Sequence, residues 1–247
     1  KQIVVESEND SKDLEKLNIQ KADNIQPISD IIPEMIEMIN GLFAKWIAYL
    51  WEDGSVYYSI AKFKNYWELA HLDMKGMRSS VRINNDEYEK DQAADFALWK
   101  SYDETKDGEN FWDAKFVING EEKIIRGRPG WHIECSACNM KFFGPQIDIH
   151  MWGEDLVFPH HQNEIAQSEG FSGKKFSQYW MHGGHLFVDN KKMSKSLNNF
   201  YRLSDIVEKM PHEKPTHVYR GFRFMGLQNK YRDGFNFTFD RLQAAIN

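Results

Sequence analysis

The chain has 247 residues, a formal net charge of −6 at pH 7, and 41% hydrophobic and 14% aromatic residues. This composition excludes a disordered segment, and 16 glycines with 7 prolines exclude a collagen-like or linker chain. No apolar run approaches the roughly 20 residues of a membrane helix, and the first residues do not resemble a signal peptide. A net acidic chain is a poor non-specific binder of nucleic acid. We expect a folded, cytoplasmic protein without a membrane partner.

The N-terminal half predicts one clear helix and one clear strand. Residues 1–26 are polar and form a lead-in. Apolar residues then recur at helical spacing over 35–46, with Pro33 suited to the first turn. Residues 55–59 follow an Asp-Gly turn and predict a short strand. Residues 73–126 are charged and rich in turns, so we expect an insertion rather than core.

The composition changes at Gly127, and strand-like runs then alternate with helical ones. The strand candidates are 147–149, 156–158 and 185–188, and the helical segments are 161–169, 203–209 and the end of the chain from about 215. Such alternation favours a parallel α/β sheet. We therefore divide the chain into the lead-in 1–26, an inserted connective region 27–126, a second half of a catalytic domain 127–214, and the start of a helical domain 215–247.

Histidines and thiols gather in the third of these segments. Six of the nine histidines fall within 132–185, together with both cysteines, Cys135 and Cys138. His160 and Glu164 are four residues apart, so on a helix they share one face, with Pro159 at its start and Gly170 after its end. Thiolate, imidazole and carboxylate together suit Zn²⁺. The residues alone predict a ligand set of Cys135, Cys138, His160 or His161, and Glu164, with two unliganded buried thiols as the alternative.

A second feature is the run Lys-Met-Ser-Lys-Ser at 192–196, between a predicted strand and a predicted helix. A given pentapeptide arises by chance in such a chain about once in ten thousand, although a motif remains a hypothesis. Lysines on a loop can neutralise the charge that develops on a leaving pyrophosphate. A solvated, lysine-rich loop is the alternative.

Several motifs in order resemble those of the cysteinyl-tRNA synthetases, which are class I aminoacyl-tRNA synthetases, over nearly the whole chain. They read GRPGWHIECSA at 127–137, DIH at 148–150, DLVFPHH at 155–161, NEIAQSE at 163–169, WMH at 180–182, GHL at 184–186 and KMSKS at 192–196. Weaker matches are DFALWK at 95–100 and KYR at 230–232. The resemblance implies an α/β fold: part of a class I Rossmann-like parallel-sheet catalytic domain with an inserted connective region and a helical C-terminal end.

The resemblance also implies an activity and a ligand set. The family activates L-cysteine with ATP, and Mg²⁺ is expected with the nucleotide; the cysteine then passes to tRNA(Cys). By motif, the protein ligands of a zinc ion that takes the substrate thiolate are Cys135, His160 and Glu164. A hydroxyl is a poor thiolate substitute on Zn²⁺, which would discriminate against serine.

The remaining site residues carried over from the family are the following. The catalytic residues are Lys192 and Lys195; the ATP-binding residues are Lys195 and Asp155; the amino-acid pocket contains Trp131 and His150. The oligomeric state stays open.

The chain also departs from the family pattern. The family's His-x-Gly-His half, with a further zinc-ligating cysteine, is expected before residue 1, and its anticodon-reading domain after residue 247. This predicts either a piece of a longer synthetase or a paralogue that has lost that half. Met151 and Trp152 replace glycines beside the expected nucleotide site, where a large side chain would intrude. Cys138 stands where the family has Met, as a substitute ligand or as an inert apolar residue.

Two other functions remain as alternatives. One is a cysteine:sugar-amine ligase of the same fold, which would depart from the motifs at 163–167 and 180–182. The other is a noncatalytic, zinc-stabilised module. The intact lysine loop at 192–196 speaks against that module, because a scaffold does not need it.

Overall fold

A computed structural model describes residues 11–66, 68–69, 95–194, 197 and 199–247. Their packing defines two compact units. We call Gln26–Met151 with Asp155–Met181 the sheet unit, and the described residues up to Ile25 with Trp152–Glu154 and His182–Asn247 the C-terminal unit. In the described part of the chain, no helix is both long and apolar enough to cross a membrane.

The sheet unit is built on a five-stranded sheet in the order β1-β2-β3-β5-β4, with every pairing antiparallel. Its strands are β1 (Ala48–Leu50), β2 (Val56–Tyr58), β3 (Phe96–Ser101), β4 (Trp112–Ile118) and β5 (Glu121–Pro129). The β4–β5 hairpin turns at Asn119 and Gly120, which both have positive φ. Asn-Gly is the favoured pair for such a turn, because neither residue strongly resists the left-handed backbone. The strand predicted at 55–59 is confirmed as β2.

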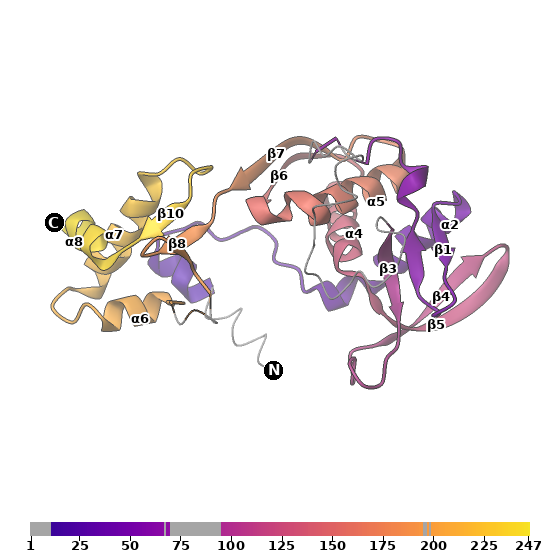
Figure 1. The fold of residues 1–247 in the computed structure, drawn as a ribbon, viewed down its shortest axis with the longest axis horizontal. Helices are drawn as coiled ribbons and strands as arrows, with labels where there is room; N and C mark the ends of the chain where they lie inside the picture. Colours follow the sequence, from indigo (N-terminus) through magenta and orange to yellow (C-terminus); the bar gives the residue numbers. More distant parts are fainter. Residues whose placement is uncertain (1–10, 67, 70–94, 195–196, 198) are drawn as a thin grey trace. The chain divides into compact units, whose positions relative to one another are not determined.

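Three α-helices pack in the described part of this unit: α2 (Ile32–Ala44), α4 (Trp131–Phe143) and α5 (Gln162–Ser172). Figure 1 shows α4 and α5 beside one another, and α2 packs on β4 and on both helices. The helix expected from the 35–46 pattern is confirmed up to Ala44, since Met35, Ile39 and Leu42 are fully buried on one stripe of α2. Trp46, the last residue of that pattern, lies beyond the helix and is exposed. Two short turns of 3-10 helix, η1 (Ile28–Ile31) and η2 (Ile60–Lys62), also belong to the unit.

The expectation that residues 73–126 lie outside the core is wrong for their described part. Leu98, Trp99 and Phe116 are fully buried in the apolar cluster of the sheet unit, to which Met35, Ile39 and Leu42 of α2 also belong. Along β4, buried and exposed residues alternate, so a charged segment still presents one apolar face. The predicted boundary after residue 126 also falls inside β5, so it does not separate two packing units; the four-segment division stays a prediction.

Two local expectations between residues 154 and 173 are also wrong. The run 156–158 forms no strand but a 3-10 turn, η3 (Glu154–Leu156), and the kinked turn η4 (Val157–His161). Pro159 has no N–H to donate to a neighbouring strand, and this disfavours a strand here even though residues 156–158 are apolar. Helix α5 ends not before Gly170 but at Ser172, where Gly173 adopts the left-handed cap with φ 73°. Gly170 instead allows close packing, because a Cβ there would lie 2.8 Å from the Tyr58 hydroxyl.

Two further strands, β6 (Ile147–Gly153) and β7 (Ser177–Gly183), form a separate two-stranded sheet. The strand predicted at 147–149 is confirmed in β6.

The C-terminal unit has its own apolar cluster. Strand β8 (Leu186–Val188) pairs in parallel with β10 (Phe235–Phe237) and antiparallel with β9 (Lys191–Lys192). Around it lie α6 (Leu203–Glu208), α7 (Pro215–Leu227) and α8 (Phe239–Ile246) (Figure 1). The cluster contains Val188, Ile206, Met210, Val218, Met225, Phe237 and Leu242. The predicted strand at 185–188 and the helices at 203–209 and beyond 215 are confirmed.

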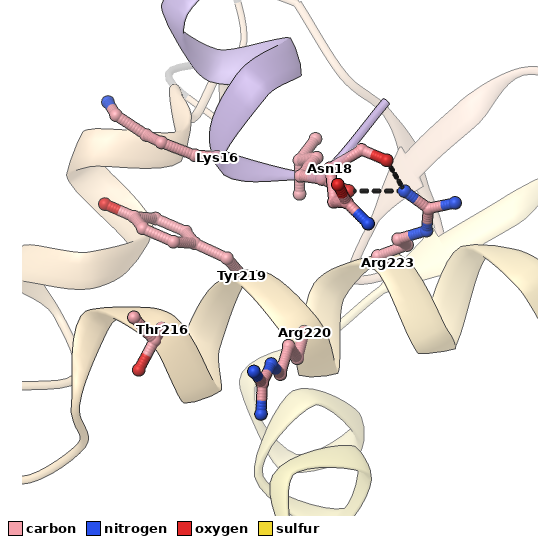
Figure 2. Close-up of a pocket in the computed structure, with 7 residues that line it drawn as sticks. Lys16, Asn18, Thr216, Tyr219, Arg220 and Arg223 are labelled. Atoms are coloured by element: carbon pink, nitrogen blue, oxygen red, sulfur yellow. Dashed lines mark hydrogen bonds between the residues drawn. The ribbon is translucent and has the colours of Figure 1, made fainter. Parts of the chain in front are cut away.

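Part of the polar lead-in is ordered on this unit. Residues 11–16 form a helical turn, and the Nη1 atom of Arg223 on α7 donates to the carbonyl oxygens of Leu17, at 2.6 Å, and of Asn18. Figure 2 shows these groups around a hollow of about 320 Å³, with Lys16 over the ring of Tyr219. The hydrogen bonds satisfy carbonyls that follow the last turn, where backbone acceptors lack partners within the helix.

Candidate metal centre and active site

Three metal-ligating side chains meet between α4 and α5 in the sheet unit. Cys135 lies in the second turn of α4, His160 in η4 directly before α5, and Glu164 in the first turn of α5. One ligand atom from each lies within 4.8 Å of the other two. We call these residues the ligand trio. The structure thus brings together the three ligands that the resemblance implied.

The carboxylate of Glu164 is fully buried, as is almost all of His160. Burial raises the pKa of Glu164, but the hydrogen bond with His150 and the close approach of the His160 imidazole lower it more, so the net pKa lies below its usual value. Oε2 accepts a hydrogen bond from Nε2 of His150 at 2.8 Å. Oε1 lies 3.0 Å from Nε2 of His160 but has no well-directed hydrogen bond among the described residues. A buried anion with one unsatisfied oxygen is a favourable place for a cation.

The thiol of Cys135 completes the trio. Burial raises the pKa of Cys135, and the nearby carboxylates of Glu164 and Glu134 raise it further. A thiol in such surroundings keeps its proton unless a divalent cation displaces it. Sulfur, imidazole nitrogen and carboxylate oxygen form a donor set that suits Zn²⁺ and does not suit Mg²⁺ or Ca²⁺. The residues present therefore fit the expected zinc.

The wider ligand set predicted from the residues alone is not assembled. Cys138 is on the same helix, three residues after Cys135, but it packs against the apolar cluster and joins no metal-ligating group in the described chain. His161 belongs to a second group, with His150 and Glu164, whose ligand atoms also lie within 4.8 Å of one another. Glu164 is shared by both groups, and the trio with Cys135 is the one that carries a thiol.

Aromatic side chains line the trio. Trp131, at the start of α4, is 43% exposed, and its ring centroid lies 4.6 Å from that of His160. His150 stacks on Trp180 at 4.7 Å with an interplanar angle of 17°. Both residues predicted for the amino-acid pocket therefore border the ligand trio. The predicted role itself remains a proposal.

The residues predicted for ATP are only partly described. Asp155 is an exposed residue of η3, and Lys192 is an exposed residue at the end of β9 in the C-terminal unit. Lys195 lies outside the described residues. Asn199 links the two sides of the lysine loop, since its Nδ2 donates to the Lys192 carbonyl at 3.2 Å and its Oδ1 accepts from the Ser194 N–H at 2.8 Å.

One residue at the site was missed as a participant. His132 is 2% exposed, and its Nδ1 lies 2.9 Å from Nδ1 of His160. The sequence signal was available, because His132 precedes Cys135 by three residues and on a helix the two share a face.

Comparison with solved structures supports the fold, and a family model defines the class. The chain is similar to Mycobacterium tuberculosis methionyl-tRNA synthetase in complex with methionyl-adenylate, with a TM-score of 0.57 at 13% identity, covering 96% of this chain and 53% of that one. At this identity the likeness concerns the fold, which is that of class I tRNA synthetases with a Rossmann-like catalytic domain. The family model described as "tRNA synthetases class I (C) catalytic domain" matches residues 2–247. The chain belongs to this family.

Curated relatives carry a more specific name. The chain is 48% identical over 238 residues to the cysteine--tRNA ligase of Chlamydia muridarum, covering 94% of this chain and 46% of the relative. It is 48% identical over 241 residues to that of Protochlamydia amoebophila, covering 95% and 46%. The chain therefore spans about half the length of the curated relatives it matches.

Proposed function

We propose that the protein containing this chain is a cysteine--tRNA ligase, which activates L-cysteine with ATP and transfers it to tRNA(Cys). The names of its relatives support this function. The observation that carries the proposal is the ligand trio of Cys135, His160 and Glu164, which combines a thiol, an imidazole and a buried carboxylate in one place. The relatives are named as cysteine--tRNA ligases, which favours this function over a cysteine:sugar-amine ligase or a noncatalytic module.

The ligand trio would hold a zinc ion. When bound, the zinc would supply a soft Lewis acid that accepts the thiolate of the substrate and discriminates against the hydroxyl of serine. A purely apolar pocket separates such near-isosteres by only a few kcal/mol. Glu164 would provide a buried negative charge that attracts the cation. The rings of Trp131 and His150 would border the amino-acid pocket beside the zinc.

The lysine loop would serve the nucleotide. Lys192 and Lys195 would neutralise charge on the departing pyrophosphate, with Asp155 and Mg²⁺ contributing to ATP binding. The nucleophile on the α-phosphate would be the carboxylate of the substrate cysteine. Asn199 would hold the start of this loop through the Lys192 carbonyl and the Ser194 N–H. A cytoplasmic location belongs to the same proposal.

Amino-acid-dependent ATP–pyrophosphate exchange tests the function in the protein that contains this chain. We expect exchange with L-cysteine and at least about a thousandfold less with L-serine, because a metal binds a thiolate much more strongly than a hydroxyl. Equal exchange with both amino acids would contradict the assigned selectivity, and exchange with neither would contradict the proposed activity.

A further inference from the structure

The ring of His132 lies behind that of His160, away from the carboxylate that His160 faces. Nε2 of His160 lies 3.0 Å from Oε1 of Glu164, whereas its Nδ1 lies 2.9 Å from Nδ1 of His132. Each ring nitrogen of His160 thus has its own neighbour. Two imidazole nitrogens at that separation share one hydrogen, so one donates and the other accepts.

The identity of the donor follows from metal binding. A histidine that gives the lone pair of Nε2 to a metal carries its hydrogen on Nδ1, and that N–H needs an acceptor when it is buried. We infer that His132 is a positioning residue for the metal: its Nδ1 accepts the Nδ1–H of His160 and so holds His160 in the tautomer and orientation that present Nε2 to the ligand trio. This inference rests on the zinc site of the proposed function.

The surroundings of His132 fix its ring. The side chain is 2% exposed, and the Phe96 ring packs edge-on against it at 5.8 Å with an interplanar angle of 88°. Phe96 begins strand β3, so the sheet supports the imidazole from the side. A ring held in this way loses little further freedom when it accepts the hydrogen bond. Partners of this kind, one step removed from a metal, typically change its affinity by about 10- to 100-fold when they are replaced.

Two polar substitutions separate the hydrogen bond from the packing. In His132→Asn, the Oδ1 atom stands one bond from Cγ, as Nδ1 does, and it can accept from His160. In His132→Gln, the carbonyl is one bond further out and misses that position. Ser136→Ala is the matched control on the same helix, because Ser136 is fully buried and its hydroxyl bonds to Oε1 of Gln167 at 2.6 Å and to the backbone carbonyl of His132 at 3.3 Å, neither of which is an imidazole nitrogen.

The measurement is the zinc dissociation constant of the full chain by competition with a chromophoric chelator. The thiolate-to-cobalt charge-transfer band of the Co²⁺-loaded protein reports on ligation by Cys135. We expect His132→Gln to bind zinc at least about tenfold more weakly, with His132→Asn and Ser136→Ala within about threefold of wild type.

Each other outcome overturns the inference. If His132→Gln binds as tightly as wild type, His132 does not position His160. If His132→Asn or Ser136→Ala weakens binding as much as His132→Gln, the effect belongs to packing and not to the hydrogen bond. A wild-type chain that binds no zinc would instead contradict the metal site of the proposed function, so the two failures are distinguishable.

Discussion

Glu164 uses its two carboxylate oxygens differently: Oε2 accepts from Nε2 of His150 at 2.8 Å, whereas Oε1 lies 3.0 Å from Nε2 of His160 and accepts no well-directed hydrogen bond from the residues that the structure describes. One oxygen is therefore anchored by His150, and the other faces the ring of His160. A buried carboxylate is costly unless its charge is compensated, and a divalent cation between Cys135, His160 and Glu164 would compensate it.

The two cysteines provide a matched pair. Cys135→Ser replaces a ligand of the trio, and we expect it to weaken zinc binding by at least about tenfold, because a neutral hydroxyl is a poor replacement for a thiolate. Cys138→Ser changes a residue of the same type on the same helix that packs against the apolar cluster, and it should leave the zinc content unchanged. Zinc analysis after dialysis measures both. Equal loss in both variants would show that Cys138 is also a ligand.

The neighbouring histidines distinguish the two overlapping ligand groups. His160→Ala removes a ligand of the trio, whereas His161→Ala removes a member of the group with His150 and Glu164. We expect His160→Ala to abolish zinc retention and His161→Ala to retain it, since only the first group contains the thiol. Metal titration of each variant provides the comparison, and the reverse order would assign the metal to the second group.

The hydroxyl of Tyr58 on strand β2 forms a hydrogen bond with helix α5, which carries Glu164. It is buried and donates to the Ala166 carbonyl of α5 at 2.8 Å. Tyr58→Phe should lower the free energy of unfolding by about 1–2 kcal/mol, because the buried carbonyl loses its side-chain donor. Tyr57→Phe is the control, since the Tyr57 hydroxyl bonds to Asp53 in an exposed setting, and it should change stability by less than about 0.5 kcal/mol. Denaturant titration of the metal-free protein compares them, and equal effects would contradict this assignment.

Substituting the adjacent lysines 191 and 192 one at a time distinguishes a catalytic role of Lys192 from a general effect of positive charge. Lys192→Ala should lower the rate of ATP–pyrophosphate exchange by about 100-fold through lost stabilisation of the developing charge, while the zinc content stays constant. Lys191→Ala removes another exposed charge from the same strand and should change the rate by less than about threefold. Steady-state exchange kinetics decide this point; similar rates for the two variants would remove Lys192 from the catalytic group.

The sequence predicts an element correctly where its apolar residues repeat with one regular spacing, helical or strand-like. Helix α2 shows apolar residues at helical spacing, and its burial confirms the pattern. The antiparallel sheet was missed because β4 and β5 are rich in charge, and three of the seven β4 residues are exposed. The apolar run at 156–158 misled because a short run does not distinguish a strand from other buried structure.

The metal ligands of the site could be predicted from the sequence, but the residues that contact and orient those ligands could not. The spacing of His160 and Glu164 places them on one face, and the family motifs add Cys135. The approach of His132 to His160 depends on how α4 packs against η4 and α5, which no local pattern encodes. The same holds for the stacking of Trp180 on His150 across two elements.

The most direct test of the account is X-ray absorption at the zinc edge of the loaded protein, recorded without amino acid, with L-cysteine and with L-serine. We predict that L-cysteine adds one sulfur to the zinc coordination shell and that L-serine adds none. An unchanged sulfur count on addition of saturating L-cysteine would contradict the claim that this site selects its substrate through a metal–thiolate bond.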